Sequence, residues 1–312
     1  MTEPQQGLSY AEVLALARTA EEAGLEAFFR SDHYASFPGE AGMPTTDAWA
    51  TLAGLARDTT RIRLGTLVSP ITFRIPGSLA KVVATTDEMS GGRIELGMGA
   101  GWNEQEHREL GIPFPTLRER YDRLEEALAI IHGLWTEPDG WSYKGKHWQV
   151  QDARFHPKPT FGGGRHTHLI LGGDGGPRLS RLVATYADEF NRQSASPDRV
   201  REAHDNVRRA CSTIGRDPET LVFSAMVGVL VGESERDISD RVGKVLETTG
   251  AGGDAEAWLA QRRNRWIMGT PDEARERVRA LEAAGVQRVM LQDFLPRDLD
   301  MVRLMGSIFR SS

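Results

Sequence analysis

The sequence predicts an α/β fold of the (β/α)8 type, a TIM barrel, formed by a single domain over residues 1–312. Seven short apolar segments alternate with amphipathic segments of helical period, and this alternation is typical of a parallel α/β fold. No G-x-G-x-x-G turn follows the first strand-like segment, whereas a doubly wound open sheet usually carries one there. A closed barrel has eight strands, so we expect the first strand, before Ser9, to be very short or truncated.

Three helix–strand units open the chain. Ser9 and Glu12 form a capping box that begins a helix, and Gly24 ends it. Thr46 is expected to cap the second helix, and Pro76 lies near the start of the third. The predicted strands of these units are 25–29, 61–68 and 93–98.

The alternation of predicted strands and helices is interrupted after Gly99 and resumes at residue 168. A long amphipathic helix over 117–134 precedes a stretch rich in Gly, Pro and aromatic residues, so we expect an insertion or lid at about 111–167, between strands four and five. Its aromatic side chains either line a lid or pack the insertion onto the barrel; they are Trp135, Trp141, Tyr143, Trp148, Phe155 and Phe161. Further strands are predicted at 168–171, 188–191, 221–231 and 287–291, alternating with helices at 178–186, 197–214, 271–284 and 299–309.

Composition excludes several classes of protein. The formal charge is −6 and no block of Lys and Arg occurs, so a nucleic-acid partner is not expected. No apolar run approaches the roughly 20 residues that span a bilayer, and the amino terminus does not resemble a secretion signal, so we expect no membrane and a cytoplasmic protein. Cys211 is the single cysteine and is read as a buried apolar residue. Without an H-E-x-x-H pair or a G-x-S-x-G elbow, neither metal catalysis nor serine-hydrolase chemistry is expected.

Five segments together resemble the luciferase-like monooxygenase superfamily, and most closely its branch of F420-dependent oxidoreductases. They are SDHY at 31–34, RIRLGTLVSP at 61–70, DEMSGGRIELGMGAGW at 87–102, GIPFPTLRERYDRLEEAL at 111–128 and YADEFN at 186–191. The resemblance implies a bacterial luciferase-like barrel whose cofactor ring lies over the carboxyl ends of the strands, with its phosphate in glycine-rich loops. It also implies a homodimer.

The chain departs from this family at three places. Met1 stands immediately before the family's first loop, and Gly162, Gly163 and Gly164 replace prolines, so that loop is expected to be more mobile. Trp102 stands where the family's sugar dehydrogenases carry a carboxylate. Their substrate is therefore not transferred to this chain.

The resemblance assigns catalysis to Asp32 and His33, which follow the first predicted strand and would lie beside the cofactor ring. His33 could accept or donate the proton that accompanies hydride transfer, because imidazole titrates near neutrality. In the alternative, His33 only shapes the pocket.

The other predicted cofactor contacts lie on later strands. Thr66, Val68 and Ser69 belong to the segment that, in the family, carries a non-proline cis peptide behind the ring; the alternative is an ordinary strand end broken by Pro70. Gly99, Ala100 and Gly101 are small enough for a ring or phosphate to approach, and Trp102 and Asn103 follow them.

Glu106 and His107 face the same pocket if a helix begins there. Gly172 and Gly173 before a helix form the stronger anion site. Asp174 is expected to cap that helix, with Arg178 or Arg181 supplying positive charge.

These features predict an enzyme that transfers a hydride between C5 of coenzyme F420 and a small apolar or carbonyl-type (enone) substrate. Two alternatives remain open: a reduced-FMN monooxygenase on the same fold, and a non-catalytic flavin-binding subunit.

Overall fold

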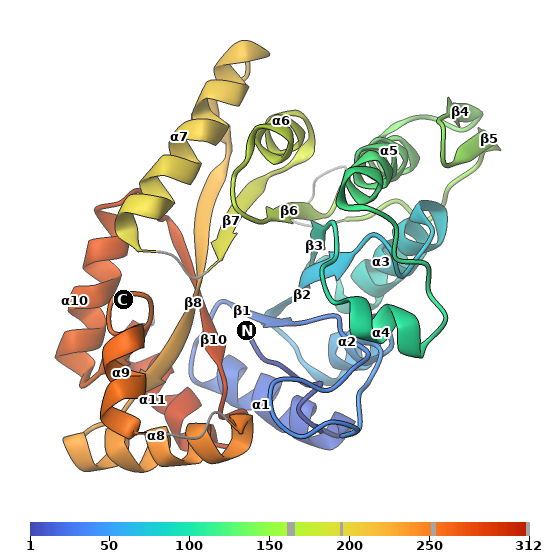
Figure 1. The fold of residues 1–312 in the computed structure, drawn as a ribbon. Coiled ribbons are helices and arrows are strands. Elements are labelled where there is room, and N and C mark those ends of the chain that lie inside the picture. The colour runs from blue at the N-terminus through green and yellow to red at the C-terminus, as the bar shows by residue number, and fades with distance from the viewer. Residues whose placement is uncertain (161–165, 194–195, 251–253, 310–312) are drawn as a thin grey trace.

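The computed structural model describes the chain except for residues 161–165, 194–195, 251–253 and 310–312. Phe161 and Gly162 to Gly164 therefore lie outside the described residues. A curled parallel sheet is surrounded by helices, and the amino terminus lies between two strands of that sheet (Figure 1).

All seven predicted barrel strands are present, and each pairs in parallel with its neighbour. In spatial order they are β1 (Ala27–Arg30), β2 (Arg63–Pro70), β3 (Ile94–Gly99), β6 (His168–Gly172), β7 (Glu189–Gln193), β8 (Val222–Val231) and β10 (Arg288–Asp293).

Residues Met1 and Thr2 stand between the two edge strands, β1 and β10. Thr2 forms parallel bridges to Arg30 and to Asp293. Its amide donates to the carbonyl of Phe29 at 2.9 Å, and the amide of Asp293 donates to the carbonyl of Met1 at 2.9 Å. A two-residue segment thus occupies the eighth position, as expected of a very short first strand.

Outer helices cover the sheet, and their ends follow the predicted signals. They are α1 (Tyr10–Glu22), α2 (Ala48–Asp58), α3 (Pro76–Ser90), α5 (Leu117–Thr136), α6 (Pro177–Tyr186), α7 (Pro197–Thr213), α10 (Pro271–Glu282) and α11 (Leu299–Phe309). Ser9 and Glu12 form the predicted capping box. The prediction for α2 was wrong by one residue: Asp47 caps it, accepting from the amide of Ala50, because Thr46 bonds the guanidinium of Arg30 instead.

The segment between β3 and β6 contains α4 (Glu104–Glu109), α5 and a hairpin of β4 (Trp141–Lys144) and β5 (Gln149–Ala153). Helix α5 contacts α3 and α6 like the other outer helices. Five of the six aromatic residues considered above for a lid are described, and they pack on the core rather than on the cavity described below: Trp135, Trp141, Tyr143, Trp148 and Phe155.

Three elements between β8 and β10 were not predicted. They are α8 (Glu235–Thr249), α9 (Ala255–Arg262) and β9 (Ile267–Gly269), which extends the sheet beside β8. The capping box of Ser234 and Asp237 was the available sequence signal for α8.

Candidate active site

A cavity of about 480 Å³ opens at the carboxyl ends of the barrel strands, where barrel enzymes place their active sites. Most of the predicted site residues line it: His33, Val68, Gly99, Ala100, Gly101, Trp102, Gly172, Gly173 and Asp174. Four others are buried and do not line it: Asp32, Thr66, Ser69 and Asn103.

His33 is oriented by a buried carboxylate. Its Nδ1 lies 2.9 Å from Oε1 of Glu106, and the two side chains are 16% and 2% exposed. The other oxygen of Glu106 accepts from the backbone amide of Tyr34 at 2.9 Å. Carboxylate oxygens accept hydrogen bonds, so Nδ1 carries the ring proton and donates. The Nε2 lone pair is then free to accept a proton.

Helix α4 places Glu106 on this wall. The side chain of Asn103 caps the helix by accepting from the amide of Gln105 at 3.1 Å, and it does not line the cavity. His107 is also turned away: Nδ1 bonds the carbonyl of Asn103 and Nε2 the hydroxyl of Thr72. Of the two residues predicted to face the pocket, only Glu106 lines it.

Aromatic side chains surround the other faces of His33. Phe37 and Trp102 meet its ring edge-on at centroid distances of 4.6 and 5.7 Å, and each other at 5.3 Å. Trp102 is 66% exposed at the mouth of the cavity. Exposure of so large an apolar side chain beside a polar group is typical of a ligand site.

Asp32 has a different environment from its neighbour His33. It is 1% exposed, and its carboxylate accepts from Arg74 at 2.6 Å and from the hydroxyl of Ser69 at 2.7 Å. Ser69 accepts in turn from the indole of Trp49 at 3.0 Å. Burial opposes the charge of Arg74, but the ion pairs with Asp32 and Asp47 together outweigh burial and raise the pKa of the guanidinium. Asp32 therefore anchors the loop that carries His33.

The end of β2 forms the floor of the cavity. The peptide bond between Leu67 and Val68 is cis, within the segment where one was expected, and the pairing register with β3 shifts between Thr66 and Ser69. The side chain of Val68 lies close to three glycines here. A Cβ added to Gly97, Gly99 or Gly172 would lie 3.1, 2.8 or 3.1 Å from Val68. These strand-end glycines make room for Val68.

The loop between β6 and α6 ends at an uncapped helix start, and the amide of Gly173 within it donates to the carbonyl of Asn191 at 3.1 Å. Gly176, not Asp174 as predicted, occupies the N-cap of α6, which has no side-chain cap, and a Cβ added to Gly176 would meet no atom within 4 Å. Asp174 is 89% exposed and pairs with Arg192 at 2.7 Å. The arginines predicted to supply charge are otherwise engaged, because Arg178 and Arg181 pair with acidic residues of α5.

Four polar side chains that the sequence did not predict line one wall of the cavity, and they connect the first residues of the chain to β10. Glu3 is 6% exposed and accepts from the amide of Gln5 at 2.7 Å and from that of Gln292 at 2.6 Å. Gln5 accepts from the hydroxyl of Ser31 at 2.6 Å. All four residues line the cavity. No local pattern pairs residue 3 with residue 292.

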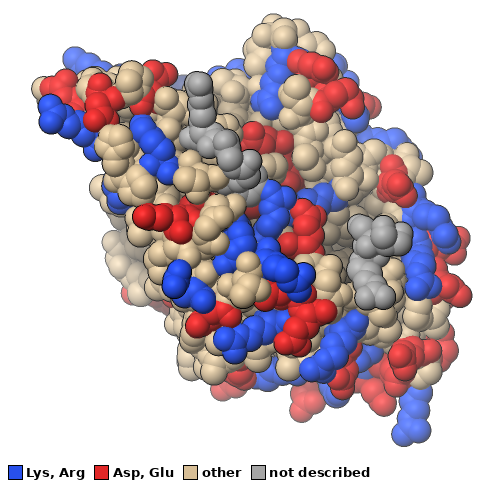
Figure 2. All heavy atoms as spheres, turned by 180° about the vertical axis from the view of Figure 1, so that it is seen from behind, with Lys and Arg blue, Asp and Glu red and all other residues tan. Residues whose placement is uncertain are grey.

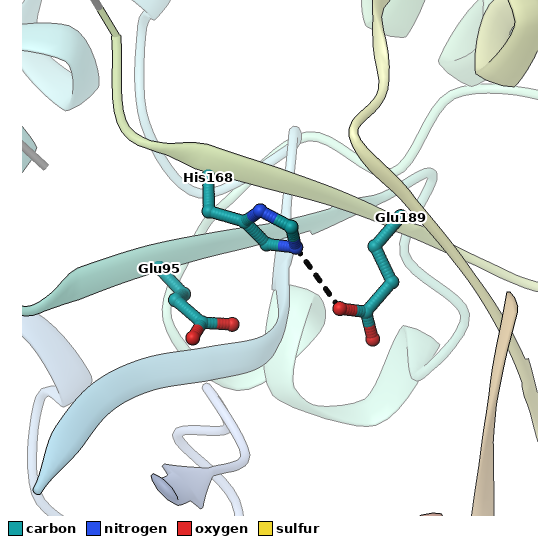
Figure 3. Close-up of side chains that lie close together, drawn as sticks. All are labelled: Glu95, His168 and Glu189. Atoms are coloured by element: carbon teal, nitrogen blue, oxygen red, sulfur yellow. Dashed lines mark hydrogen bonds and ion pairs between the residues drawn. The ribbon is translucent and has the colours of Figure 1, made fainter. Parts of the chain in front are cut away.

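One group of described residues has donor atoms close enough to hold a metal: Glu95, His168 and Glu189 (Figure 3). It lies at the amino ends of the strands, opposite the cavity. Arg288 bridges the two carboxylates at 2.6 and 3.0 Å, and His168 bonds Glu189 at 3.0 Å. Burial opposes ionisation of Glu189, but His168 and Arg288 hold the pKa of its carboxyl below the usual value. The guanidinium of Arg288 therefore already neutralises the carboxylate charge that a bound metal ion would otherwise neutralise.

Basic and acidic side chains are interspersed over the face seen in Figure 2. Within the described residues, no helix is both long and apolar enough to cross a bilayer.

The fold and the cavity define a (β/α)8-barrel protein with its ligand site at the carboxyl ends of the strands. The sequence pattern of the luciferase-like monooxygenase family matches residues 1–288. The chain belongs to this family, which confirms the resemblance inferred from the sequence.

The chain is similar to curated F420-dependent glucose-6-phosphate dehydrogenases. The protein from Amycolatopsis mediterranei is 35% identical over 181 residues, which are 57% of this chain and 52% of that relative; the one from Microbacterium testaceum is 35% identical over 181 residues, 57% of this chain and 51% of that relative. The chain thus spans about half the length of the curated relatives it matches.

Two solved structures show the same fold. An F420-dependent secondary alcohol dehydrogenase in complex with an F420–acetone adduct has a TM-score of 0.83 at 18% identity and covers 98% of this chain and 96% of its own. A monooxygenase from Streptomyces bottropensis has a TM-score of 0.81 at 22% identity, and the match covers 96% of this chain and 92% of that protein. At these identities the likeness concerns the fold alone.

Proposed function

We propose that the protein is a coenzyme F420-dependent oxidoreductase that interconverts an alcohol and a carbonyl compound. The observation that carries this proposal is the His33–Glu106 pair on the cavity wall, which presents a free Nε2 beside the floor made by Val68. The names of the curated relatives and of the first structural neighbour support F420 as the cofactor.

The shape of the cavity fits such a cofactor. The floor of Val68 and Gly99 to Gly101 offers a face free of long side chains to a flat ring. The uncapped start of α6 would hold the phosphate beside the small residues Gly172 and Gly173, since helix N-termini favour anions. When bound, F420 supplies a two-electron hydride acceptor at its C5.

The protein's own residues then handle orientation and the proton. In the oxidative direction, His33 Nε2 accepts the hydroxyl proton of the substrate while the carbon-bound hydrogen leaves as hydride, so an alcohol becomes a ketone. The resulting imidazolium is stabilised by Glu106 at 2.9 Å. The Asp32–Arg74 pair holds the loop in place, so that little reorganisation accompanies the reaction.

Equilibrium binding of the purified chain to F420 and to FMN, each oxidised and reduced, tests this proposal. We expect micromolar binding of F420 and much weaker binding of FMN. The reverse preference would assign the chain to the oxygen-consuming monooxygenases, and binding of neither would favour the non-catalytic subunit. We also propose a homodimer formed by barrel helices, which light scattering at several concentrations tests.

A further inference from the structure

We infer that the substrate is a small uncharged alcohol or ketone with apolar groups beside its reacting carbon, held against the wall of Phe37 and Trp102, and not a sugar phosphate. This inference rests on the proposed function and names its substrate class.

The first support is the wall itself. Phe37 and Trp102 pack edge-on against His33 and against each other, and both line the cavity. Trp102 keeps 66% of its surface exposed in the free protein. An apolar group placed there would remove this surface from water, which stabilises the complex in proportion to the area covered.

The second support is the charge of the lining. Three carboxylates line the cavity, those of Glu3, Glu106 and Asp174. None of the described lining side chains is that of a lysine or arginine. The guanidinium of Arg192 pairs with the lining carboxylate of Asp174 at 2.7 Å, so this cation is already engaged. The start of α6 is the site proposed for the phosphate of F420. A second phosphate, on the substrate, would lose water and meet the carboxylates of Glu3 and Glu106 without a lining cation, and both effects oppose its binding.

The third support is the position of His33. The imidazole that the proposed reaction uses lies in ring contact with Phe37 and Trp102. The amides of Gln5 and Gln292 each donate one of their two N–H groups to Glu3, at 2.7 and 2.6 Å. The reacting hydroxyl would therefore have the aromatic wall as its immediate neighbour.

Steady-state kinetics of the full chain loaded with F420 tests the inference, with cyclohexanol and glucose 6-phosphate as probes. We expect kcat/KM for cyclohexanol to exceed that for glucose 6-phosphate by about 100-fold or more. Saturation-transfer NMR with cyclohexanone, which the oxidised holoenzyme does not turn over, gives a readout independent of activity. Its signal should fall in Trp102→Ala.

A pair of matched variants tests the electrostatic part. Leu117 and Leu110 are each 55% exposed, but only Leu117 lines the cavity. Leu117→Arg should raise kcat/KM for glucose 6-phosphate about tenfold, while Leu110→Arg should not. Equal behaviour of the two variants contradicts the inference.

The outcomes separate the two proposals. If F420 binds and glucose 6-phosphate reduces it as well as cyclohexanol does, the substrate class is wrong and the cofactor assignment stands. If F420 binds but cyclohexanone gives no NMR signal, the substrate class is again wrong. If F420 does not bind, the proposed function fails and the substrate class fails with it.

Discussion

The carboxylate of Glu106 lies 2.9 Å from Nδ1 of His33, although 73 positions separate the two residues in the sequence. The loop after β1 and helix α4, which follows β3, bring them together. The same carboxylate also accepts from the amide of Tyr34, so Glu106 fixes both the ring and the backbone that carries it.

The variant Glu106→Gln should lower kcat by about 10- to 100-fold, less than the full contribution of about 10²–10⁴ from general acid–base catalysis. Gln keeps an acceptor but loses the charge that stabilises the imidazolium. The solvent deuterium isotope effect on kcat should rise, while Kd for F420 should stay unchanged. Glu104→Gln, on the exposed side of the same helix, serves as the control and should behave like the wild type.

The variant Gly176→Ala should weaken F420 binding about tenfold or more without changing stability. An added Cβ at Gly176 meets no protein atom within 4 Å but protrudes at the helix end proposed for the phosphate. Calorimetry gives Kd and a thermal melt gives stability. Gly77→Ala, where a Cβ is equally unobstructed, should leave Kd unchanged; weaker binding in both variants would argue against a local effect.

Removing the cation beside Asp32 should destabilise the fold. Arg74→Met leaves a buried carboxylate without its main partner, and losses of about 3–5 kcal/mol are typical of such changes. Urea unfolding measures the loss. Arg74→Met combined with Asp32→Asn should recover part of it, whereas Arg303→Met, at an exposed ion pair, should cost under about 1 kcal/mol. If Arg74→Met lost no more unfolding free energy than Arg303→Met, the carboxylate of Asp32 would have to be solvated in the folded protein.

Stability should fall as the pH falls, in part because of His204. Burial lowers the pKa of this imidazole from 6.5 to about 4, and neither ring nitrogen has a hydrogen-bond partner. Above pH 6.5 the ring is neutral in both states. Between about 6.5 and 4 only the unfolded state takes up the proton, which costs at most about 3 kcal/mol of stability.

His204→Leu should therefore flatten the loss of stability between pH 7 and 5, as measured by urea unfolding at each pH. His156→Leu removes an imidazole that is 66% exposed and should retain the wild-type slope. An unchanged slope in His204→Leu would show that the buried ring is protonated in the folded state.

The barrel strands and helix ends could be predicted because they depend on local signals, namely apolar periodicity and capping residues such as Ser9. Where two capping residues compete, sequence alone failed: Asp47 caps α2 because Arg30, 16 positions away, engages Thr46. The segment of α8 and α9 was missed although Ser234 and Asp237 form a capping box.

The cavity residues were predicted in part. His33, Val68 and the glycine-rich segments follow strand ends, and strand ends converge in a barrel. The positions of Asp32 and Glu106 depend on which long-range partner each finds, Arg74 for one and His33 for the other. Glu3 reaches the cavity only because the chain start lies beside β10.

Phe37 and Trp102 belong to irregular segments that take no part in the pairing of the barrel strands, while the buried ionic cluster around Arg288 lies at the opposite end of the barrel. Loop positions of this kind tolerate replacement far better than strand positions. The aromatic wall is therefore a natural target for saturation mutagenesis, and variant libraries at these two positions should yield biocatalysts of altered substrate range from one stable scaffold.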